Sequence, residues 1–223
     1  MRNWEKGCLS DLIKSLEQGV SVNSIDDNNI NETTPLILKT SCVSARFFDP
    51  TESKKIHPKD LGKQKLNPVA DSILISRMNT PALVGASAYV KKTYKNIFLP
   101  DRLWMAVKKH DEVCMEWLSQ IIASDYYWSK IRDCATGTSP SMKNISKKDL
   151  LKLPILIPSY AEQLKISKVL KTWDTAIEKT EALLAAKERQ FGWLKSKLLS
   201  KNPNRGFLRN PPKVPDLRFS LSF

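Results

Sequence analysis

Short apolar runs alternate with polar, turn-forming stretches through the first 110 residues of the chain. The runs are PLILKTSCVS, DSILISR, ALVGASAYV, NIFLP and RLWMAV. They are apolar or β-branched, and Pro, Gly, Asn and Asp separate them, which is the pattern of short strands in a mixed β core. The sequence therefore predicts that this part of the chain is substantially β.

Apolar residues at helical spacing occur near the N-terminus. Leu9, Leu12, Ile13 and Leu16 predict a short amphipathic helix that ends at Gly19. The segment from 20 to 34 is polar and rich in turn-forming residues, so we expect an exposed loop there.

A second region of helical spacing lies between residues 111 and 137. Its apolar positions form two groups, Val113, Trp117, Ile121 and Ile122, then Tyr127, Trp128 and Ile131. The aromatic side chains allow two interpretations, base-stacking platforms or core. Their spacing beside Ile and Leu favours core.

A long helix is predicted after Pro158. Ser159 with Glu162 three residues later forms a capping-box pattern. Ten positions, eight of them apolar, then follow one another at alternating intervals of four and three residues, which is a heptad pattern. The ten positions, called the stripe below, are Ile166, Leu170, Trp173, Ile177, Thr180, Leu184, Lys187, Phe191, Leu194 and Leu198.

The stripe is about 50 Å long at 1.5 Å per residue and requires a covering surface. An antiparallel pair of identical helices fits it, because Trp173 then faces Phe191 and Leu170 faces Leu194. The two-fold axis passes near residue 182. The stem of Lys187 packs on aliphatic surface in this pair. Alternatively, the stripe packs against a different protein or against the rest of this chain.

The net charge of +13 indicates a polyanionic partner, either nucleic acid or an anionic membrane surface. No run of 18 apolar residues occurs, and the start MRNWEKGC leads into no hydrophobic targeting region. We therefore expect a cytoplasmic protein without a membrane span.

Metal and cofactor chemistry find little support in the sequence. The four cysteines are far apart and form no C-x-x-C, so we expect buried thiols rather than a zinc site or disulfide framework. His57 and His110 lie in polar surroundings without nearby ligands. No metal and no cofactor are expected.

The sequence disfavours two DNA-modifying activities, adenine methylation and metal-dependent cleavage. Asn210, Pro211 and Pro212 resemble the N-P-P-aromatic loop of adenine methyltransferases, but Lys213 stands at the aromatic position and no G-x-G occurs in the chain. A metal-dependent nuclease is disfavoured because the acidic pairs, such as Asp111 with Glu112, form no pattern that would hold a catalytic metal.

The chain resembles the specificity subunits of type I restriction-modification systems, in a half-length form. The stretches that carry the resemblance are LKTSCVSARFFDPTESKKI, ADSILISRMNTPALVGASAYV, LPDRLWMAV, ATGTSPSMKNIS and LPILIPSYAEQLKI. The resemblance implies an α+β fold with a β-rich target recognition domain over residues 1–158, called the head below. A spacer and dimerisation helix over 159–200 follows, forming an antiparallel coiled coil, and residues 201–223 resemble the start of a second recognition domain.

What the resemblance implies for function is a non-catalytic protein. The head would read one half of a split site in double-stranded DNA, and the helix would separate two heads and dock methyltransferase subunits. Restriction subunits stay open as further partners. Two copies as a homodimer would read a palindromic, interrupted site. A basic coiled-coil adaptor that binds nucleic acid nonspecifically is the alternative.

Contacts to DNA should divide into phosphate contacts by Lys and Arg and base contacts by groups with directional donors and acceptors. Arg77 and Asn79 are the expected base contacts, with Arg46 as a further candidate. The lysines at 54–65 could instead belong to a solvated loop that binds nothing. The loop around Gly137 could instead only cap the helix that follows it. The remaining candidates are Lys54, Lys55, Lys59, Lys63, Lys65, Lys91, Lys92, Thr138, Ser139, Lys143 and Asn144.

Overall fold

Strand β8 (Ser72–Ser76) alternates between two apolar clusters, which explains why it has no exposed face. Ile73 and Ile75 lie in one buried cluster, and Leu74 lies in the other. Successive side chains of a strand point to opposite faces of the sheet, so both faces here are covered. These positions come from a computed structural model that describes residues 4–26, 31, 33–44, 46–137 and 141–199.

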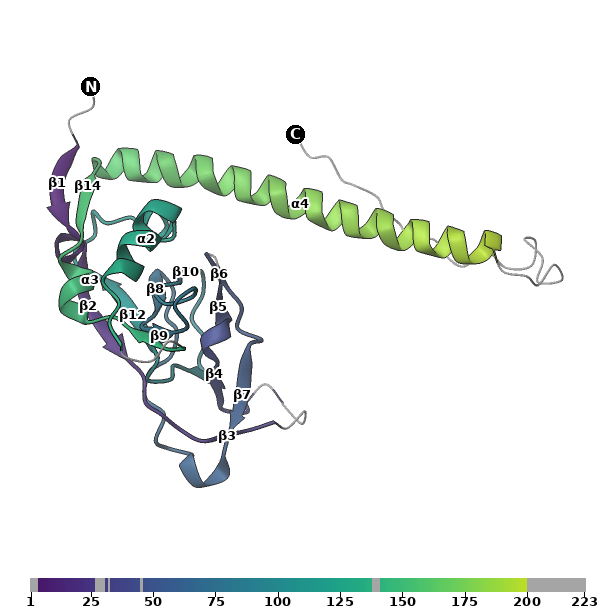
Figure 1. Cartoon of the computed structure of the whole chain (residues 1–223), viewed down its shortest axis with the longest axis horizontal. Helices are drawn as coiled ribbons and strands as arrows, with labels where there is room; N and C mark the ends of the chain where they lie inside the picture. Colours follow the sequence, from purple (N-terminus) through teal and green to yellow (C-terminus); the bar gives the residue numbers. More distant parts are fainter. Residues whose placement is uncertain (1–3, 27–30, 32, 45, 138–140, 200–223) are drawn as a thin grey trace. The chain divides into compact units, whose positions relative to one another are not determined.

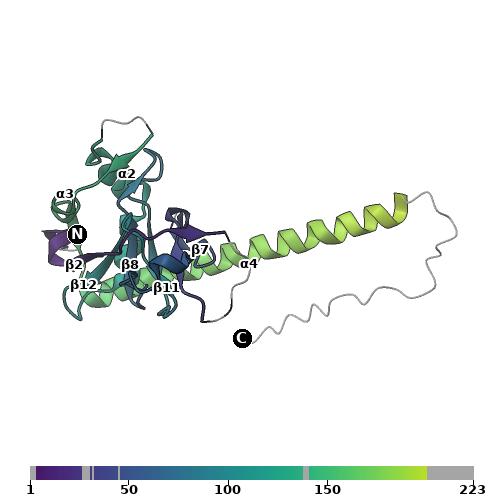
Figure 2. The ribbon, with the colours of Figure 1, turned by 90° about the horizontal axis from the view of Figure 1, so that it is seen from below.

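The first sheet has four antiparallel strands in the order β10-β8-β12-β2. Its other strands are β10 (Ser87–Val90), β12 (Leu103–Lys108) and β2 (Ile13–Gln18). Three helices contribute to the cluster on one face: α1 (Met115–Ile122), α2 (Asp125–Asp133) and α3 (Lys147–Leu151). Figure 2 shows α2 and α3 on the same side of β2 and β12.

The opposite face of the first sheet is covered by the hairpin of β5 (Val43–Ser44) and β6 (Phe47–Phe48). A second sheet has the order β11-β4-β7-β3, with β11 parallel to β4 and the other pairs antiparallel. Figure 1 shows β3 and β7 at the far end of the head from β1 and β14. The strands of the second sheet are β11 (Ile97–Phe98), β4 (Leu36–Leu38), β7 (Ser53–Ile56) and β3 (Ser24–Ile25). Two 3-10 turns, η2 (Thr40–Cys42) and η3 (Pro58–Asp60), lie in the same part of the chain.

Two further strand pairs join distant segments. The pair β1 (Glu5–Cys8) with β14 (Pro154–Ile157) brings the N-terminal segment to the residues that precede the long helix. The pair β9 (Met78–Asn79) with β13 (Lys143–Asn144) brings the end of the first sheet to the loop after α2. Both pairs are antiparallel, so each fixes which residues face one another.

The long helix α4 (Tyr160–Leu199) begins as the capping pattern predicts. The backbone N–H and hydroxyl of Ser159 both donate to Oε2 of Glu162, at 3.3 and 3.1 Å. Gln163 accepts from the N–H of Cys114 at 3.0 Å, and Ser167 donates to Glu116 at 3.1 Å. These contacts dock the first turns of α4 onto α1. The chain divides into one compact unit, Met1–Lys171, and a second that begins at Thr172.

The expected fold class is confirmed: a β-rich domain precedes a long helix. The five apolar runs contain β4, β8, β10, β11 and β12, and the second region of helical spacing forms α1 and α2. The core interpretation of the aromatics is confirmed for Trp117, which is 1% exposed. Trp128 is partly buried, and its indole N–H donates to the carbonyl of Val84 at 2.9 Å.

The predicted N-terminal helix is wrong. Residues Leu9–Asp11 form a single 3-10 turn, η1, between β1 and β2. Strand β2 pairs with β12 through a register shift at Val107 and Lys108. Because this bulge inserts one residue on the β2 side, Ile13 and Leu16 reach the same buried cluster with a spacing of three. That spacing imitates a helical turn.

Two other expectations need correction. The polar segment 20–34 is not loop throughout, because Ser24–Ile25 forms β3 and pairs with β7. The segment of lysines begins as strand β7 and continues into η3, so only its later part is loop. Of the cysteines, all free, Cys42 is buried while Cys8, Cys114 and Cys134 are partly exposed.

The stripe on α4 changes character along its length. Ile166 is partly buried and packs against the core of the head. From Leu170 onward the large apolar side chains are exposed, reaching 67% at Trp173 and 68% at Phe191. Within the described residues, no helix is both long and apolar enough to cross a membrane.

Candidate nucleic-acid interface

Arg77 directly follows strand β8 and is partly buried. Ile73 and Ile75 belong to the cluster beneath α1, and the period of two puts residue 77 on the same face. Across the ladder, Trp104 of β12 pairs with Ile75 on one side and with Gln18 of β2 on the other. The face therefore changes from apolar to polar where these three strands end.

Two cations flank the indole of Trp104, which is 2% exposed. The guanidinium carbon of Arg77 lies 5.8 Å from the ring centroid, and Nζ of Lys147 lies 6.0 Å from it. Arg77 Nη1 also donates to Oε1 of Gln18 at 2.9 Å. Cation–π contact and a hydrogen bond together hold the Arg77 guanidinium in one orientation.

The β9–β13 pair brings further polar side chains next to Arg77. Asn79 faces Lys143, while the carbonyl of Arg77 accepts from the N–H of Ile145 at 2.9 Å. Asn79 Nδ2 donates to the hydroxyl of Ser76 at 3.1 Å, and its Oδ1 accepts from the N–H of Thr80 at 2.8 Å. The predicted contacts Arg77, Asn79, Lys143 and Asn144 therefore come together.

We call this group the Arg77 cluster. Its side chains come from β2, β8–β9, β13 and α3, which are segments far apart in the sequence. Nε of Arg77 and Oδ1 of Asn144 are buried and have no hydrogen-bond partner among the described residues. The cluster thus presents cations and amide groups at one place, next to the buried indole of Trp104. Its members are Gln18, Arg77, Asn79, Lys143, Asn144 and Lys147.

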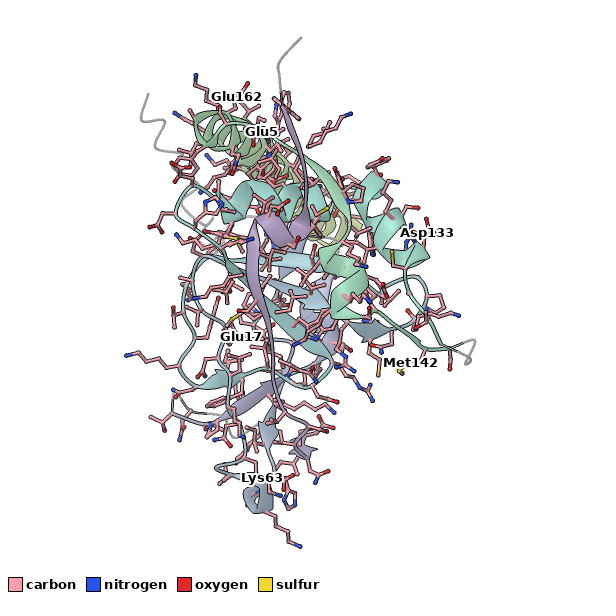
Figure 3. All side chains as sticks on the ribbon, turned by 90° about the vertical axis from the view of Figure 1, so that its left-hand side faces the viewer. Glu5, Glu17, Lys63, Asp133, Met142 and Glu162 are labelled. Carbon is pink, nitrogen blue, oxygen red and sulfur yellow. The ribbon has the colours of Figure 1, made fainter. Side chains whose placement is uncertain are left out.

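The lysines at 54–65 lie elsewhere and are partly neutralised. Lys54 forms an ion pair with Asp26 at 3.0 Å, and Lys63 forms one with Asp60 at 2.5 Å. Figure 3 shows Lys63 at the far end of the head from Glu162, and well away from Glu17, the neighbour of Gln18. This segment is therefore separate from the Arg77 cluster.

Asp60 anchors the turn η3. It is 6% exposed, and besides Lys63 it accepts from the backbone N–H and the side-chain amide of Asn23, at 2.7 and 2.9 Å. The hydrogen bond from Lys63, followed by those from Asn23 and the charge of Lys63, lowers the pKa of Asp60 to about 2. A charged carboxylate at this position stabilises the turn and restrains Lys63.

The other expected cations are exposed but scattered. Lys91 and Lys92 follow β10 at the end that pairs with Ser72, which is the opposite end of the ladder from Arg77. Lys92 Nζ lies 5.2 Å from the ring of Tyr94. Lys59 and Lys65 are exposed, and Lys55 is partly buried on β7.

Arg46 occupies a strained position at the tip of the β5–β6 hairpin. Its φ is +82°, a left-handed backbone conformation that favours glycine, and its backbone bridges to Ala88 of β10. The side chain is exposed. Thr138 and Ser139, and the tail over 201–223, lie outside the described residues, so the structure does not describe these candidates.

An acidic hollow lies at the start of α4, far from the Arg77 cluster. Glu5, Asp11, Glu112 and Glu162 line it together with His110, and Figure 3 shows Glu5 and Glu162 close together at one end of the head. No group of three or more His, Cys, Asp or Glu suited to a metal ion occurs within the part of the chain that the structure describes.

Thiol chemistry has no support at the buried cysteine. Burial, followed by the carboxylates of Glu52 and Asp49, raises the pKa of the Cys42 thiol to about 12. A thiol with that pKa is protonated near neutral pH and is a poor nucleophile.

Two members of the cluster, Gln18 and Lys147, and the tryptophan that both Arg77 and Lys147 contact were not predicted from the sequence. Gln18 was missed because the preceding residues were interpreted as a helix, which hid the pairing of β2 with β12. Lys147 belongs to a basic pair after Asn144, and its contacts with the ring of Trp104 and with the carbonyl of Leu16, to which Nζ donates at 2.5 Å, distinguish it from Lys148. Trp104 itself lies in a strand that was correctly predicted, but its neighbours across the sheet were not predictable.

The chain is similar in sequence and in fold to known proteins. A family model described as the type I restriction modification DNA specificity domain matches residues 1–186. The specificity subunit of the type I restriction enzyme EcoEI from Escherichia coli is 24% identical over 163 residues, which are 73% of this chain and 27% of that protein.

Solved structures show the same fold. The S subunit of a type I restriction-modification system from M. genitalium matches with a TM-score of 0.54 and 18% identity, covering 91% of this chain and 47% of that one. The HsdS subunit from Thermoanaerobacter tengcongensis matches with a TM-score of 0.57 and 13% identity, covering 96% and 51%. The chain thus spans about half the length of these subunits.

Proposed function

The chain belongs to the type I restriction-modification DNA specificity domain family, and from that premise we propose that it reads one half of a split DNA site. The observation that carries this proposal is the Arg77 cluster. Arginine, asparagine and glutamine side chains make the directional hydrogen bonds that distinguish base edges in the major groove. Phosphate contacts by lysines fix the register of such a reader on the duplex.

Within the cluster we assign Arg77 and Asn79 to bases, and Lys143 and Lys147 to phosphates. Arg46, Lys54, Lys55, Lys59, Lys63, Lys65, Lys91 and Lys92 stay candidates for contacts along the flanking backbone. The ion pairs of Lys54 and Lys63 reduce the charge that these two side chains can offer. Exposed lysines such as Lys59, Lys65 and Lys91 should carry more of the phosphate binding.

We further propose that two copies pair through α4 in antiparallel orientation. The exposed stripe from Leu170 to Leu198 supports this, because side chains as large as Trp173 and Phe191 gain most by burial against a second apolar helix. A closed two-fold pair makes the heads equivalent. The DNA target would then hold two inverted copies of one half-site, roughly one duplex turn of about 34 Å apart.

The chain itself performs no catalytic step in this proposal. Methyltransferase subunits would bind along the helix and supply the chemistry, and restriction subunits would be further partners of the complex. The role of the chain is to hold two readers at a fixed distance and to position those enzymes over the site.

Competition binding tests the proposed reading of sequence. Duplexes enriched from a random pool by the full chain should outcompete random duplexes of equal length by at least about a thousandfold at fixed salt. The measurement is made with and without a methyltransferase subunit. Equal competition under both conditions would instead support the nonspecific coiled-coil adaptor.

A further inference from the structure

The hydrogen bond between Arg77 and Gln18 limits what this pair can offer a ligand. An arginine guanidinium only donates, so the atom of Gln18 that faces Nη1 at 2.9 Å must be the acceptor oxygen Oε1. That oxygen already has one partner. The amide nitrogen of Gln18 remains, and it too only donates.

Apart from the second lone pair of Oε1, the free groups of the pair are therefore N–H donors. Nη2 of Arg77 and Nε2 of Gln18 come from the ends of β8 and β2, the two strands that flank β12, and the Gln18 side chain is exposed. The indole of Trp104 lies 5.8 Å from the guanidinium carbon and restricts its rotation. The orientation of these donors is thus set before any ligand binds, which reduces the ordering cost of binding.

We infer that Gln18 is a specificity-determining residue, and that the Gln18–Arg77 pair selects guanine at one position of the half-site. Guanine alone presents two acceptors, N7 and O6, on its major-groove edge. Adenine presents one acceptor and one donor, and its donor would face another donor here. The inference rests on the proposed function, and it deepens that function by naming the base.

Gln18 acts on the base in two ways in this account. Its oxygen positions the Arg77 fork, and its nitrogen supplies a further donor. Lys147, whose Nζ lies 6.0 Å from the centroid of the Trp104 ring, would contact a phosphate and carry no base preference. Loss of Gln18 should therefore change one base preference, whereas loss of Lys147 should weaken binding to every sequence equally.

The test is selection of bound duplexes from a random pool by the full chain, followed by sequencing. The variants are Gln18→Met, which removes the acceptor and keeps the side-chain length, and Gln18→Ala, in case the first fails to fold. Gln64→Met is the matched control, because Gln64 Oε1 also accepts a hydrogen bond, from the N–H of Gly62 at 2.8 Å, but lies outside the cluster. Thermal unfolding checks that each variant is folded.

The wild-type chain should select guanine at one position of each half-site. Gln18→Met should lower that preference about tenfold, within the range of a bidentate contact, and leave the other positions unchanged. Gln64→Met should leave every position unchanged. The salt dependence of binding should be the same for all three proteins, because no phosphate contact is lost.

Two outcomes separate failure of this inference from failure of the proposed function. If the wild-type chain enriches a site but Gln18→Met leaves all base preferences intact, or changes all of them equally, the role of Gln18 is refuted and the reading function stands. If the wild-type chain enriches no sequence, with its methyltransferase subunit present, both are refuted.

Discussion

Two tryptophans show how differently the two parts of the chain treat apolar surface. Trp117 on α1 is 1% exposed among the buried residues of the head, whereas Trp173 on α4 is 67% exposed. Both occur at helical spacing beside other apolar residues. The head contains its own cover for such a pattern, made of strands and three helices, while the later turns of α4 do not. Apolar residues that a chain leaves exposed at regular helical spacing indicate a surface that binds another chain.

Replacing each tryptophan with alanine should give the largest difference between the two parts of the chain. Trp117→Ala should cost about 3–5 kcal/mol of unfolding free energy, because it leaves a cavity in a packed core. Trp173→Ala should change the unfolding of the head by no more than about 0.5 kcal/mol, as expected of an exposed position. Chemical denaturation monitored by far-UV circular dichroism measures both. Equal losses would show that Trp173 packs on the head.

A charge in the stripe should separate the two copies without harming the head. Leu184→Asp places a carboxylate where we propose an apolar interface, and the penalty of about 3 kcal/mol corresponds to roughly 100-fold weaker pairing. Light scattering at micromolar concentration measures the mass. Ala182→Asp, on the opposite face of the helix, is the control and should stay dimeric. A wild-type monomer at that concentration would contradict the pairing.

The two groups of lysines offer a finer comparison. Lys147→Met should reduce the slope of log affinity against log salt by about one, because it removes one phosphate contact. Lys63→Met should reduce it by less, since Asp60 already neutralises part of that charge. Affinities measured between about 50 and 200 mM salt give both slopes. A larger effect at Lys63 would move the main phosphate contact to the segment 54–65.

The smallest expected effect is the acid sensitivity of the turn η3. The folded pKa of Asp60, about 2, lies below its ordinary value. Its contribution to stability is therefore fully present above about pH 4, the unfolded value, and is lost as the pH falls toward 2. Thermal unfolding between pH 5 and 2 should lose less stability in Asp60→Asn than in the wild type. Parallel curves would exclude this role for Asp60.

Much of the head was predictable because its central strands, β8 and β12, contribute side chains to buried clusters on both faces of the sheet. Apolar runs such as that of β8 identify themselves without knowledge of their neighbours, and the capping pair of Ser159 and Glu162 marked the start of α4. The prediction failed at β2, where a bulge against β12 gave Ile13 and Leu16 a helical spacing. Local spacing cannot reveal a bulge that depends on a strand 90 residues later.

The sequence predicted several charged and polar residues of the site but did not predict which residues lie next to one another. Arg77, Asn79, Lys143 and Asn144 were chosen for their chemistry, and the β9–β13 pair explains why they meet. Nothing in the sequence indicated that Gln18 and Lys147 would converge on Trp104. Contacts across a sheet depend on register, and register is set by the whole fold rather than by neighbouring residues.

The arrangement of the selected DNA site tests the central claim most directly. Duplexes enriched by the full chain are sequenced, and the two halves of each site are compared in both orientations. Two identical heads held apart by paired helices predict inverted copies of one half-site at a single fixed spacing. Unlike halves, or copies at variable spacing, would contradict the account.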